Sequence, residues 1–339
     1  MTVDTYSAVV LRGIKELRLE QQEKPVLGEG EALIRMKACG ICGSDLHFWK
    51  GEMPVPFPCP MGHEGSGVVE ELGGGDVNGI AVGDRVAIMP SSLETMNMLG
   101  RYSKQPAKLL YKIPDHVSFE EAAYVEPLAV SLHAVKRGGI APSSPATVFI
   151  IGAGPIGQNS LLCAKVEGAS WVGVMDIRED RLEAAKKLGA DAVVQPAPAS
   201  AQPEKPAVDS GDVIKATVAR ALALLPEGKQ VDVVVDAVGS SDTLNTAISL
   251  VKPFGVVVNV GIGHFKANVD MLTAAYKQID IRPAFAYPTE FPEALELIAS
   301  GRVDVKPLLT HTLPLEEFEK GYNTALESKA GSVKVMFQI

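Results

Sequence analysis

Several features that would set a protein apart from ordinary enzymes are scarce or missing in this sequence. Only four cysteines occur in 339 residues, too few for a disulfide-stabilised scaffold of this size. No apolar run is long enough to span a bilayer, and the N-terminal segment MTVDTYSAVVLRG lacks the basic start and long apolar core of a secretory signal. The formal net charge of −9 argues against a surface that binds nucleic acid or anionic membranes. These absences predict a soluble, cytoplasmic protein with neither a nucleic-acid nor a membrane partner.

The length of the chain, 339 residues, is sufficient for two domains. Hydrophobic residues make up 46% of the chain, so a large buried core is expected. Residues 6–36 alternate apolar and polar positions between Gly and Pro breaks, and the same pattern continues at residues 65–69 and 83–88, which predicts a β-rich, barrel-like domain. The pattern is helical over residues 119–135. Strands and helices then alternate as far as residue 263, which predicts an α/β fold with a doubly wound parallel sheet and helices on both faces.

Two later segments complete the predicted organisation. Residues 195–212 are rich in Pro, Ala and Ser, which is typical of a surface insertion between a strand and a helix. The C-terminal part begins with a predicted helix at residues 292–302 and ends in a strand, VKVMFQI. We expect this tail to return to the first domain.

The strongest functional pattern lies in residues 147–176. They read TVFIIGAGPIGQNSLLCAKVEGASWVGVMD: an apolar run, a glycine loop, a helical segment and a second apolar run that ends at Asp176. Gly152 allows a tight turn, Gly154 lets a pyrophosphate approach the backbone, and Gly157 allows the helix to pack closely on the strand. The free N–H groups at the helix N-terminus favour phosphate. The stretch therefore predicts a dinucleotide-binding unit.

The plainer alternative is an ordinary strand–turn–helix, because glycine clusters also make simple turns. The acid at the end of the second apolar run favours the dinucleotide and, among dinucleotides, NAD, since Asp176 would hydrogen-bond both ribose hydroxyls. Arg178 follows two residues later and keeps NADP as the minor alternative.

A second pattern combines cysteine, histidine and an acid. The segment CGICGSDLH contains Cys42, and Gly62 is followed by His63 and Glu64. Thiolate, imidazole and carboxylate together suit zinc, and three ligands leave a fourth position open for catalysis. The pair Cys39 and Cys42 is also compatible with a thioredoxin-type redox site, although no βαβ unit surrounds it, or with half of a structural zinc site, although no second CxxC follows.

At this point the chain resembles a known family over nearly its full length. It is similar to the zinc-dependent medium-chain alcohol dehydrogenases, in the branch of the sorbitol, xylitol and arabinitol (polyol) dehydrogenases. The motifs that carry the resemblance are CGICGSDLHFW, GHEGSGVVEELG, VGDRVAI, VEPLAVSLHAV, GAGPIG, DIREDRL and VDVKPLLTHTLPLEEFEKGY. It implies a GroES-like catalytic domain, residues 1–134 and 285–339, and a Rossmann NAD-binding domain, residues 135–284.

The resemblance also implies roles by position. The metal ligands would be Cys42, His63 and Glu64, with Glu126 binding the zinc directly or through its water, and Asp45 would orient the ligand histidine. Ser44 would take the alcohol proton and His47 would pass it to solvent. The implied cofactor-binding residues are Gly152, Gly154, Pro155, Ile156, Gly157, Asp176, Arg181, Val260, Gly261, Ile262 and Phe285, the last within the segment Ala284–Ala286.

The sequence departs from the family in two places. The family carries a cysteine-containing lobe where this chain has only residues 89–110, without cysteine, so we expect one catalytic zinc per chain, no structural zinc and a wider substrate cleft. Polyol dehydrogenases typically have Tyr at the position of Phe48 and Arg at that of Ala286. Both differences remove hydrogen-bond donors for sugar hydroxyls.

We therefore expect NAD(H)-dependent oxidation of a secondary alcohol, or reduction of its ketone, with fewer hydroxyl groups than a sugar alcohol. A true polyol dehydrogenase is the first alternative, and a non-catalytic NAD(P)H-binding protein is an alternative of another class. The family implies a homodimer or homotetramer, and the strand at residues 256–260 could pair across a two-fold axis.

Overall fold

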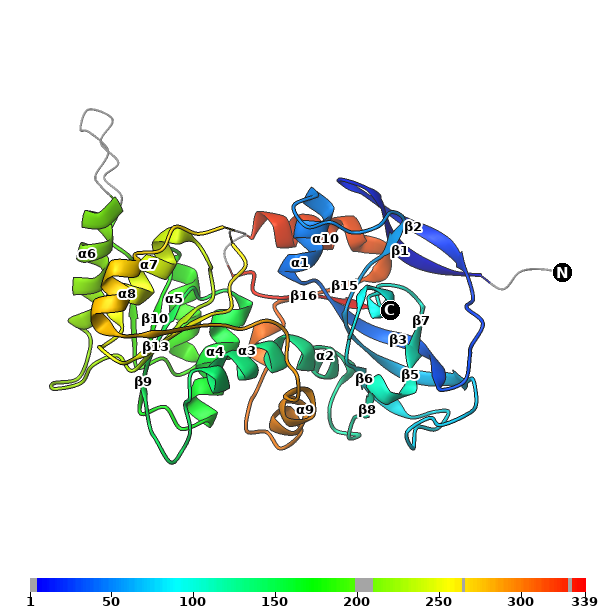
Figure 1. Ribbon diagram of the computed structural model, residues 1–339. Coiled ribbons are helices and arrows are strands. Elements are labelled where there is room, and N and C mark those ends of the chain that lie inside the picture. Colours follow the sequence, from blue (N-terminus) through cyan, green and yellow to red (C-terminus); the bar gives the residue numbers. More distant parts are fainter. Residues whose placement is uncertain (1–4, 199–209, 264–265, 329–330) are drawn as a thin grey trace. The chain divides into compact units, whose positions relative to one another are not determined.

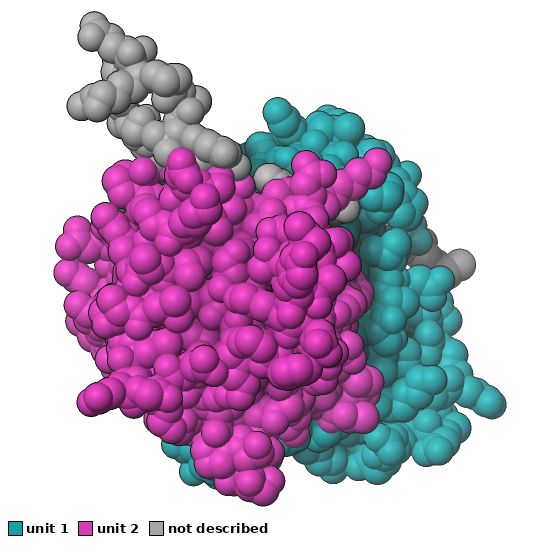
Figure 2. All heavy atoms as spheres, turned by 60° about the vertical axis from the view of Figure 1, so that its left-hand side comes forward, with its two compact units in different colours: residues 1–126, 291–339 teal, residues 127–290 magenta. Residues whose placement is uncertain are grey.

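The computed structural model describes residues 5–198, 210–263, 266–328 and 331–339, and the chain divides into two compact units. Unit 1 comprises residues 1–126 and 291–339, and unit 2 comprises residues 127–290 (Figure 2). The predicted domains break instead after residues 134 and 284. Near the second boundary, Glu290 Oε1 accepts a hydrogen bond from His133 Nδ1 at 3.0 Å, which joins the segment before residue 291 to α3 (Val125–Arg137).

Unit 2 is built on a six-stranded sheet in which every neighbouring pair of strands is parallel. Its order is β11-β10-β9-β12-β13-β14. The strands are β9 (Thr147–Ile151), β10 (Trp171–Met175), β11 (Ala192–Val194), β12 (Val233–Asp236), β13 (Val256–Asn259) and β14 (Asp280–Pro283). All residues of β9, β10 and β12 are buried, as expected for strands covered on both faces. The predicted α/β fold is confirmed.

The helices of unit 2 connect successive strands and pack around the sheet (Figure 1). They are α4 (Pro155–Val166), α5 (Glu179–Lys187), α6 (Ser210–Leu222), α7 (Ser241–Leu250) and α8 (Met271–Lys277). From the centre of the sheet, β9 is followed outward by β10 and β11 on one side. On the other side, β12 is followed outward by β13 and β14. Because parallel crossovers are right-handed, the two halves of the sheet carry their helices on opposite faces. The strand order changes direction between β9 and β12, and this is where such sheets bind ligands.

The single helix predicted for residues 119–135 is two helices, α2 (Phe119–Ala123) and α3 (Val125–Arg137). Ser118 and Glu121 form a capping box that starts α2. Pro127 has no N–H group to donate to the carbonyl four residues earlier, so the first helix cannot continue through it. The buried Tyr124 separates the two helices.

Unit 1 contains the remaining strands, which form two largely antiparallel sheets. One sheet has the order β2-β1-β4, and the other has the order β15-β16-β3-β5-β6-β8, with β7 also paired to β3. The strands are β1 (Thr5–Gly13), β2 (Glu16–Glu23), β3 (Glu31–Gly40), β4 (Cys59–Pro60), β5 (Glu64–Leu72), β6 (Arg85–Ile88), β7 (Tyr102–Pro106), β8 (Leu110–Lys112), β15 (His311–Pro314) and β16 (Val335–Gln338). Because β16 pairs with β3, the C-terminal tail belongs to this unit.

The other helices of unit 1 are short and lie between these strands. They are α1 (Gly43–Lys50), α2, α9 (Phe291–Ala299), α10 (Phe318–Glu327) and the 3-10 turns η1 (Leu93–Thr95), η2 (Ala107–Leu109), η3 (Lys306–Leu308) and η4 (Leu315–Glu317). The sequence analysis did not predict α1. Within the described residues, no helix combines the length and apolar character needed to cross a membrane.

Side-chain hydrogen bonds hold the cysteine-free span of residues 89–110. The amide nitrogen of the buried Gln105 donates to Thr95 O at 3.0 Å, to Asn97 Oδ1 at 3.0 Å and to Ser103 Oγ at 2.7 Å. The backbone N–H of Leu99 donates to Met61 O at 2.8 Å. The span is therefore fixed to the rest of unit 1 by polar contacts of its own residues.

The structure bears on one of two further expectations about unit 2. The strand expected to pair across a two-fold axis, β13, pairs with β12 on one side and β14 on the other, so both of its edges are occupied. That expectation was wrong because β14, whose short sequence DIRP gives little strand signal, adds one more strand. Residues 199–209 of the expected surface insertion lie outside the described residues.

Candidate active site

Cys42, His63 and Glu64 come together in unit 1. Their ligand atoms all lie within 4.8 Å of one another, and no other group of three or more such side chains occurs among the described residues. Cys42 precedes α1 at the end of β3, and Glu64 begins β5. These two strands pair in register, with Gly40 opposite Glu64, so the sheet itself brings the thiol to the imidazole and the carboxylate.

Asp45 is the buried acid beside this cluster. Its Oδ2 accepts a hydrogen bond from Cys42 N at 2.9 Å, which fixes the first turn of α1. Its Oδ1 lies 3.4 Å from His63 Nδ1, and both atoms are buried and without a hydrogen-bond partner. Burial alone would lower the pKa of His63, but the negative charges of Asp45 and Cys42 outweigh burial and raise it.

These atoms fit a zinc ion. Sulfur, nitrogen and oxygen donors are the ligands that zinc takes in proteins, and a carboxylate behind a ligand histidine is its usual companion. The buried carboxylate of Glu64 is already paired with the ammonium of Lys334, so the fit to zinc rests on the three donor types and on the short distances between them.

A buried lysine that the sequence analysis missed is paired with Glu64. The ammonium of Lys334 contacts both carboxylate oxygens, and the two side chains are 3% and 1% exposed. Burial alone would lower the pKa of Lys334, but the negative charges of Glu64 and Cys42 outweigh it, and the pKa is raised. A β-carbon at Gly40 would lie only 2.2 Å from Glu64 Oε2, so the opposite strand leaves just enough room for the carboxylate. Glu64 thus belongs to the cluster and also contacts a positive charge, the ammonium of Lys334.

The other residues assigned to catalysis lie in two different environments. Ser44 Oγ is 3.4 Å from His63 Nε2, at the edge of the cluster. His47 Nδ1 is 2.6 Å from Glu52 Oε2, and its side chain is partly exposed, which suits contact with solvent. Glu126 is buried in the first turn of α3 and adds negative charge near Lys334, but it is not part of the three-residue cluster.

The two positions that differ from polyol dehydrogenases have contrasting surroundings. Phe48 is buried in the hydrophobic core of unit 1. Ala286 is exposed in unit 2 and has a positive φ of 51°. Neither side chain offers a hydrogen-bond donor.

The glycine loop of unit 2 has the geometry of a phosphate-binding turn. Gly152 has a φ of 93°, and a β-carbon at Gly157 would lie 1.8 Å from Gly152 O, so α4 starts in direct contact with the turn. Next to Gly154 a β-carbon would meet only Arg181 Nη1, at 3.7 Å. Pro155 occupies the first position of α4, where the missing N–H costs nothing. The loop therefore leaves open backbone in front of a helix N-terminus.

Asp176 connects this loop to the end of β10. Its Oδ2 accepts from Ala153 N at 2.6 Å, and its Oδ1 accepts from Arg178 N at 2.8 Å. A carboxylate accepts about four hydrogen bonds, so capacity remains for ribose hydroxyls. The guanidinium of Arg178 is engaged by Asp180 at 3.0 and 2.6 Å, whereas Arg181 Nη1 lies 3.7 Å from Asp176 Oδ2. Arg178, the residue on which the NADP alternative depended, is thus paired with Asp180.

The remaining cofactor candidates follow β13 and β14. The N–H groups of Val260 and Gly261 donate to the carbonyl oxygen of Asp236, at 3.0 and 2.9 Å. Ile262 is 37% exposed and Phe285 is 75% exposed. Both are large apolar side chains that unit 2 leaves partly or largely exposed.

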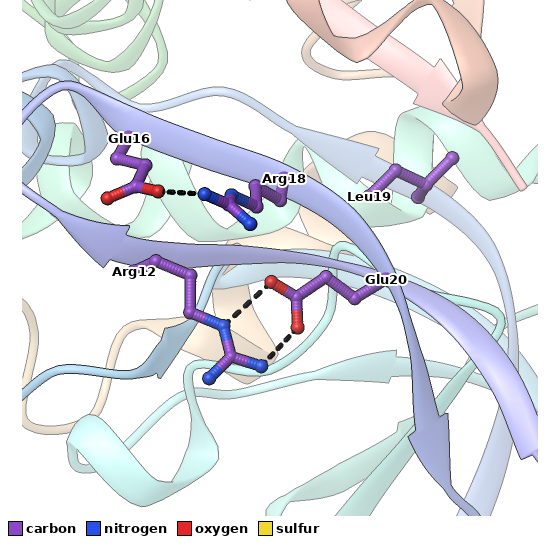
Figure 3. A pocket seen from close by; sticks show the side chains of 5 residues that line it. All are labelled: Arg12, Glu16, Arg18, Leu19 and Glu20. Atoms are coloured by element: carbon purple, nitrogen blue, oxygen red, sulfur yellow. Dashed lines mark hydrogen bonds and ion pairs between the residues drawn. The ribbon is translucent and has the colours of Figure 1, made fainter.

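A pocket on the β1–β2 hairpin is lined by other residues. Figure 3 shows its five lining side chains, Arg12, Glu16, Arg18, Leu19 and Glu20. Arg12 pairs with Glu20, and Arg18 pairs with Glu16. The charged side chains of this pocket therefore neutralise each other in pairs. The pocket is lined by none of the candidate site residues described above.

Comparison with known proteins gives a consistent result. The family description "Alcohol dehydrogenase GroES-like domain" matches residues 28–126, and "Zinc-binding dehydrogenase" matches residues 155–300. Sorbitol dehydrogenase of Gallus gallus is 36% identical over 98% of this chain and 96% of its own length. Sorbitol dehydrogenase of Homo sapiens is 36% identical over 98% of this chain and 95% of its own length. In both cases the chain matches nearly the whole relative.

Solved structures agree on the fold. The structure of 2R,3R-butanediol dehydrogenase from Bacillus subtilis is similar with a TM-score of 0.82 and 27% identity, over 98% of this chain and 99% of that one. An alcohol dehydrogenase from E. coli CFT073 complexed with NADH has a TM-score of 0.84 and 22% identity, over 99% of both chains, which shows the fold alone. From the full-length identity and the two matching domains, the chain belongs to the zinc-binding dehydrogenases, as a polyol-dehydrogenase-like alcohol dehydrogenase that depends on zinc and NAD.

Proposed function

We propose that this enzyme interconverts a secondary alcohol and its ketone, and that the alcohol carries fewer hydroxyl groups than sorbitol. The observation that carries the proposal is the cluster of half-buried Cys42 with buried His63 and Glu64, whose three donor types suit a catalytic zinc. The glycine loop and Asp176 of unit 2 supply a place for NAD. Both requirements of the family's reaction are therefore supported by residues of this chain.

The chain's residues have distinct tasks in this proposal. Zinc, when bound, supplies Lewis acidity that lowers the pKa of an alcohol, and the nicotinamide cofactor accepts the hydride. Cys42, His63 and Glu64 hold the metal, and Asp45 orients His63. Ser44 lies next to His63 and would relay the proton that the alcohol loses: its oxygen accepts that proton while its own hydroxyl proton passes on toward His47. His47 delivers that proton to solvent, assisted by its contact with Glu52.

Lys334 and Glu126 adjust the charge around the metal. Cys42 as a thiolate and Glu64 as a carboxylate would together neutralise a divalent zinc. The buried ammonium of Lys334 adds a positive charge beside Glu64, and Glu126 opposes it from α3. Lys334 offsets one of the negative charges of Glu64, Glu126 and Asp45, and less negative surroundings favour loss of the alcohol proton, so Lys334 would assist the step in which Ser44 accepts it.

NAD binds to unit 2 in this proposal. The pyrophosphate would sit over Gly154 at the N-terminus of α4. Asp176 would accept hydrogen bonds from the adenosine ribose hydroxyls, and its negative charge would repel a 2′-phosphate. Val260, Gly261, Ile262 and Phe285 would contact the nicotinamide half.

The substrate class rests on two side chains. Phe48 and Ala286 offer no hydrogen-bond donor where polyol dehydrogenases typically have Tyr and Arg. A site that cannot hydrogen-bond a buried hydroxyl pays about 1–3 kcal/mol for each one it desolvates. Two such losses, about 2–6 kcal/mol together, correspond to a factor of roughly thirty to twenty-five thousand in catalytic efficiency. This favours an apolar or cyclic secondary alcohol.

A true polyol dehydrogenase is the second candidate, because the relatives at 36% identity are named sorbitol dehydrogenases. A panel of alcohols and ketones, followed by NADH absorbance, separates the two. We expect poor turnover of sorbitol and xylitol, better turnover of cyclic or aryl secondary alcohols, and a gain on polyols in Phe48→Tyr/Ala286→Arg. Wild-type efficiency on sorbitol or xylitol above about 10⁴ M⁻¹s⁻¹ would establish the polyol enzyme instead.

We further infer a homodimer or homotetramer. β14 is an edge strand of the six-stranded sheet, and α8, which precedes it, exposes Met271, Leu272 and Tyr276 at 62%, 67% and 81%. An unpaired strand edge beside apolar side chains favours pairing with a second copy. Light scattering coupled to gel filtration tests this, and a monomer that persists at high concentration would contradict it.

A further inference from the structure

Asp236 is a buried acid for which the proposed chemistry has no role. It ends β12 and is 0% exposed. In the sheet it lies opposite Ile151 of β9 and Asn259 of β13. Ile151 directly precedes the glycine loop. Asp236 therefore lies at the change of strand direction, between the loop that faces the pyrophosphate and the segment that follows β13.

The carboxylate and the carbonyl oxygen of Asp236 hold the two segments that follow β12 and β13. Its Oδ1 accepts from Val238 N at 2.9 Å and from Gly239 N at 3.0 Å, which forms the turn after β12. Its Oδ2 accepts from the hydroxyl of Thr243 at 3.0 Å, in the first turn of α7. Its carbonyl oxygen accepts from the N–H groups of Val260 and Gly261. One residue thus fixes both the turn after β12 and the segment after β13.

The two turns and the glycine loop touch one another. A β-carbon at Gly261 would lie 2.3 Å from the carbonyl carbon of Val238, so the segment after β13 rests directly on the turn after β12. A β-carbon at Gly152 would lie 2.7 Å from Val238 Cγ2, so the same turn also touches the glycine loop. A shift of residues 237–239 would be transmitted to residues 260–262, because no side chain separates them.

We propose that Asp236 is a positioning residue for the nicotinamide half of NAD: its carboxylate sets the turn on which Val260 and Gly261 rest. This inference depends on the proposed placement of nicotinamide at residues 260–262. It does not extend to the adenosine half, because Asp176 and Ala153 hold that side of the glycine loop with hydrogen bonds of their own. Burial raises the pKa of Asp236, and the donors at Gly239, Val238 and Thr243 oppose that rise, so these hydrogen bonds offset part of the cost of burying the acid.

The test compares two ligands that share the adenosine half. NADH contains nicotinamide and ADP-ribose does not, so a defect confined to the nicotinamide side weakens only NADH. Dissociation constants are measured by calorimetry on the full zinc-loaded enzyme and on Asp236→Ala and Asp236→Asn. Asp232→Asn is the matched control, because Asp232 lies just before the same strand, at its other end, and accepts a hydrogen bond from Thr147 N at 2.7 Å.

For Asp236→Ala we expect NADH affinity to fall about tenfold, the equivalent of one or two lost hydrogen bonds, while ADP-ribose affinity changes less than about threefold. Asp236→Asn should recover most of the NADH affinity, because its amide oxygen still accepts from both turn N–H groups. The Asp232→Asn control should bind both ligands like the wild type. Equal losses for NADH and ADP-ribose, or no loss for NADH, would overturn the inference.

Thr243→Val provides the same comparison if Asp236→Ala does not fold. It removes the donor to Oδ2 and leaves the carboxylate and its turn contacts in place. We expect a smaller loss, about threefold for NADH and none for ADP-ribose, and an equal effect on both ligands would again overturn the inference. If the wild-type enzyme bound ADP-ribose and NADH with equal affinity, the positioning role would be refuted and the adenosine site would remain supported. Binding of neither ligand would refute the proposed cofactor site itself.

Discussion

In the proposed function each unit binds a charged ligand, and the two units do so by opposite means. Unit 1 uses side chains: a thiol, an imidazole and a carboxylate meet among a second acid and a buried ammonium. Unit 2 uses mainly backbone: a glycine turn, a helix N-terminus and carboxylates that bind N–H groups. Charges buried together are strongly interdependent, whereas backbone hydrogen bonds spread their effect over many groups. Single substitutions should therefore damage the first site far more than the second.

The largest expected effect comes from Cys42→Ser. Loss of the thiolate should release zinc and lower kcat/KM by about a thousandfold or more, since the metal provides several kcal/mol of transition-state stabilisation. NADH binding, measured by fluorescence, should stay within about threefold of wild type because unit 2 is unchanged. Cys59→Ser is the control, because Cys59 is a nearby buried cysteine outside the cluster. Near-normal turnover in Cys42→Ser would contradict the ligand assignment.

The next effect concerns Lys334→Met, which leaves the Glu64 carboxylate buried without its counter-charge. Removing one partner of a buried ion pair costs about 3–5 kcal/mol, and we expect the zinc-free protein to lose that much stability in urea unfolding. Zinc should recover part of the loss, since a cation beside Glu64 replaces the ammonium. The double variant Lys334→Met/Glu64→Gln should be more stable than the single variant in the zinc-free form. A loss below about 1 kcal/mol in the single variant would mean that the pair is not a buried charge pair.

Asp176→Ala tests the backbone-built site and should have a smaller effect. The variant loses ribose hydrogen bonds and the anchor of Ala153, so NAD efficiency should fall about tenfold, equivalent to 1.4 kcal/mol. The catalytic efficiency with NADP should fall less, because the repulsion between Asp176 and the 2′-phosphate is also removed. The ratio of the efficiencies with NAD and NADP should therefore decrease. Steady-state kinetics with both cofactors measures this. A wild type that prefers NADP, or an unchanged cofactor preference in the variant, would show that Asp176 does not determine the preference for NAD.

The smallest effect on the two sites is expected for Gln105→Leu in the short span of unit 1, which should change stability alone. The variant loses three hydrogen bonds that hold residues 95–103, and we expect a loss of about 1–2 kcal/mol in the free energy of unfolding. Zinc content and kcat should not change, because the network contacts none of the cluster residues. Loss of zinc together with stability would instead show that this span supports the metal site.

The contrast between the units also explains what could be predicted from the sequence. The glycine loop and Asp176 lie within one local stretch of strand, turn and helix, so their pattern is readable directly. Cys42 and His63 are 21 positions apart, so no single local pattern joins them, and they were proposed as ligands from their residue types and from the family resemblance. Lys334 lies 270 positions from Glu64, and its only signal was a lysine in the apolar segment VKVMFQI.

The errors in the predicted fold have physical reasons too. The break between α2 and α3 follows from Pro127, a signal that was present but overridden by the apolar pattern around it. β14 was overlooked because DIRP is short and polar, and its pairing with β13 is a non-local contact that no local pattern shows. The role of Asp236 likewise depends on a turn, a helix and a neighbouring strand that only the folded chain brings together.

The central claim, that unit 1 binds a single catalytic zinc through Cys42, His63 and Glu64, is tested most directly by counting metal. Elemental analysis of the purified wild type and of Cys42→Ser, after dialysis against a weak chelator, measures zinc per chain. We predict one tightly bound zinc in the wild type and none in the variant, since the described residues provide one cluster of this kind. Two tightly bound zinc ions in the wild type, or full retention of zinc by Cys42→Ser, would contradict it.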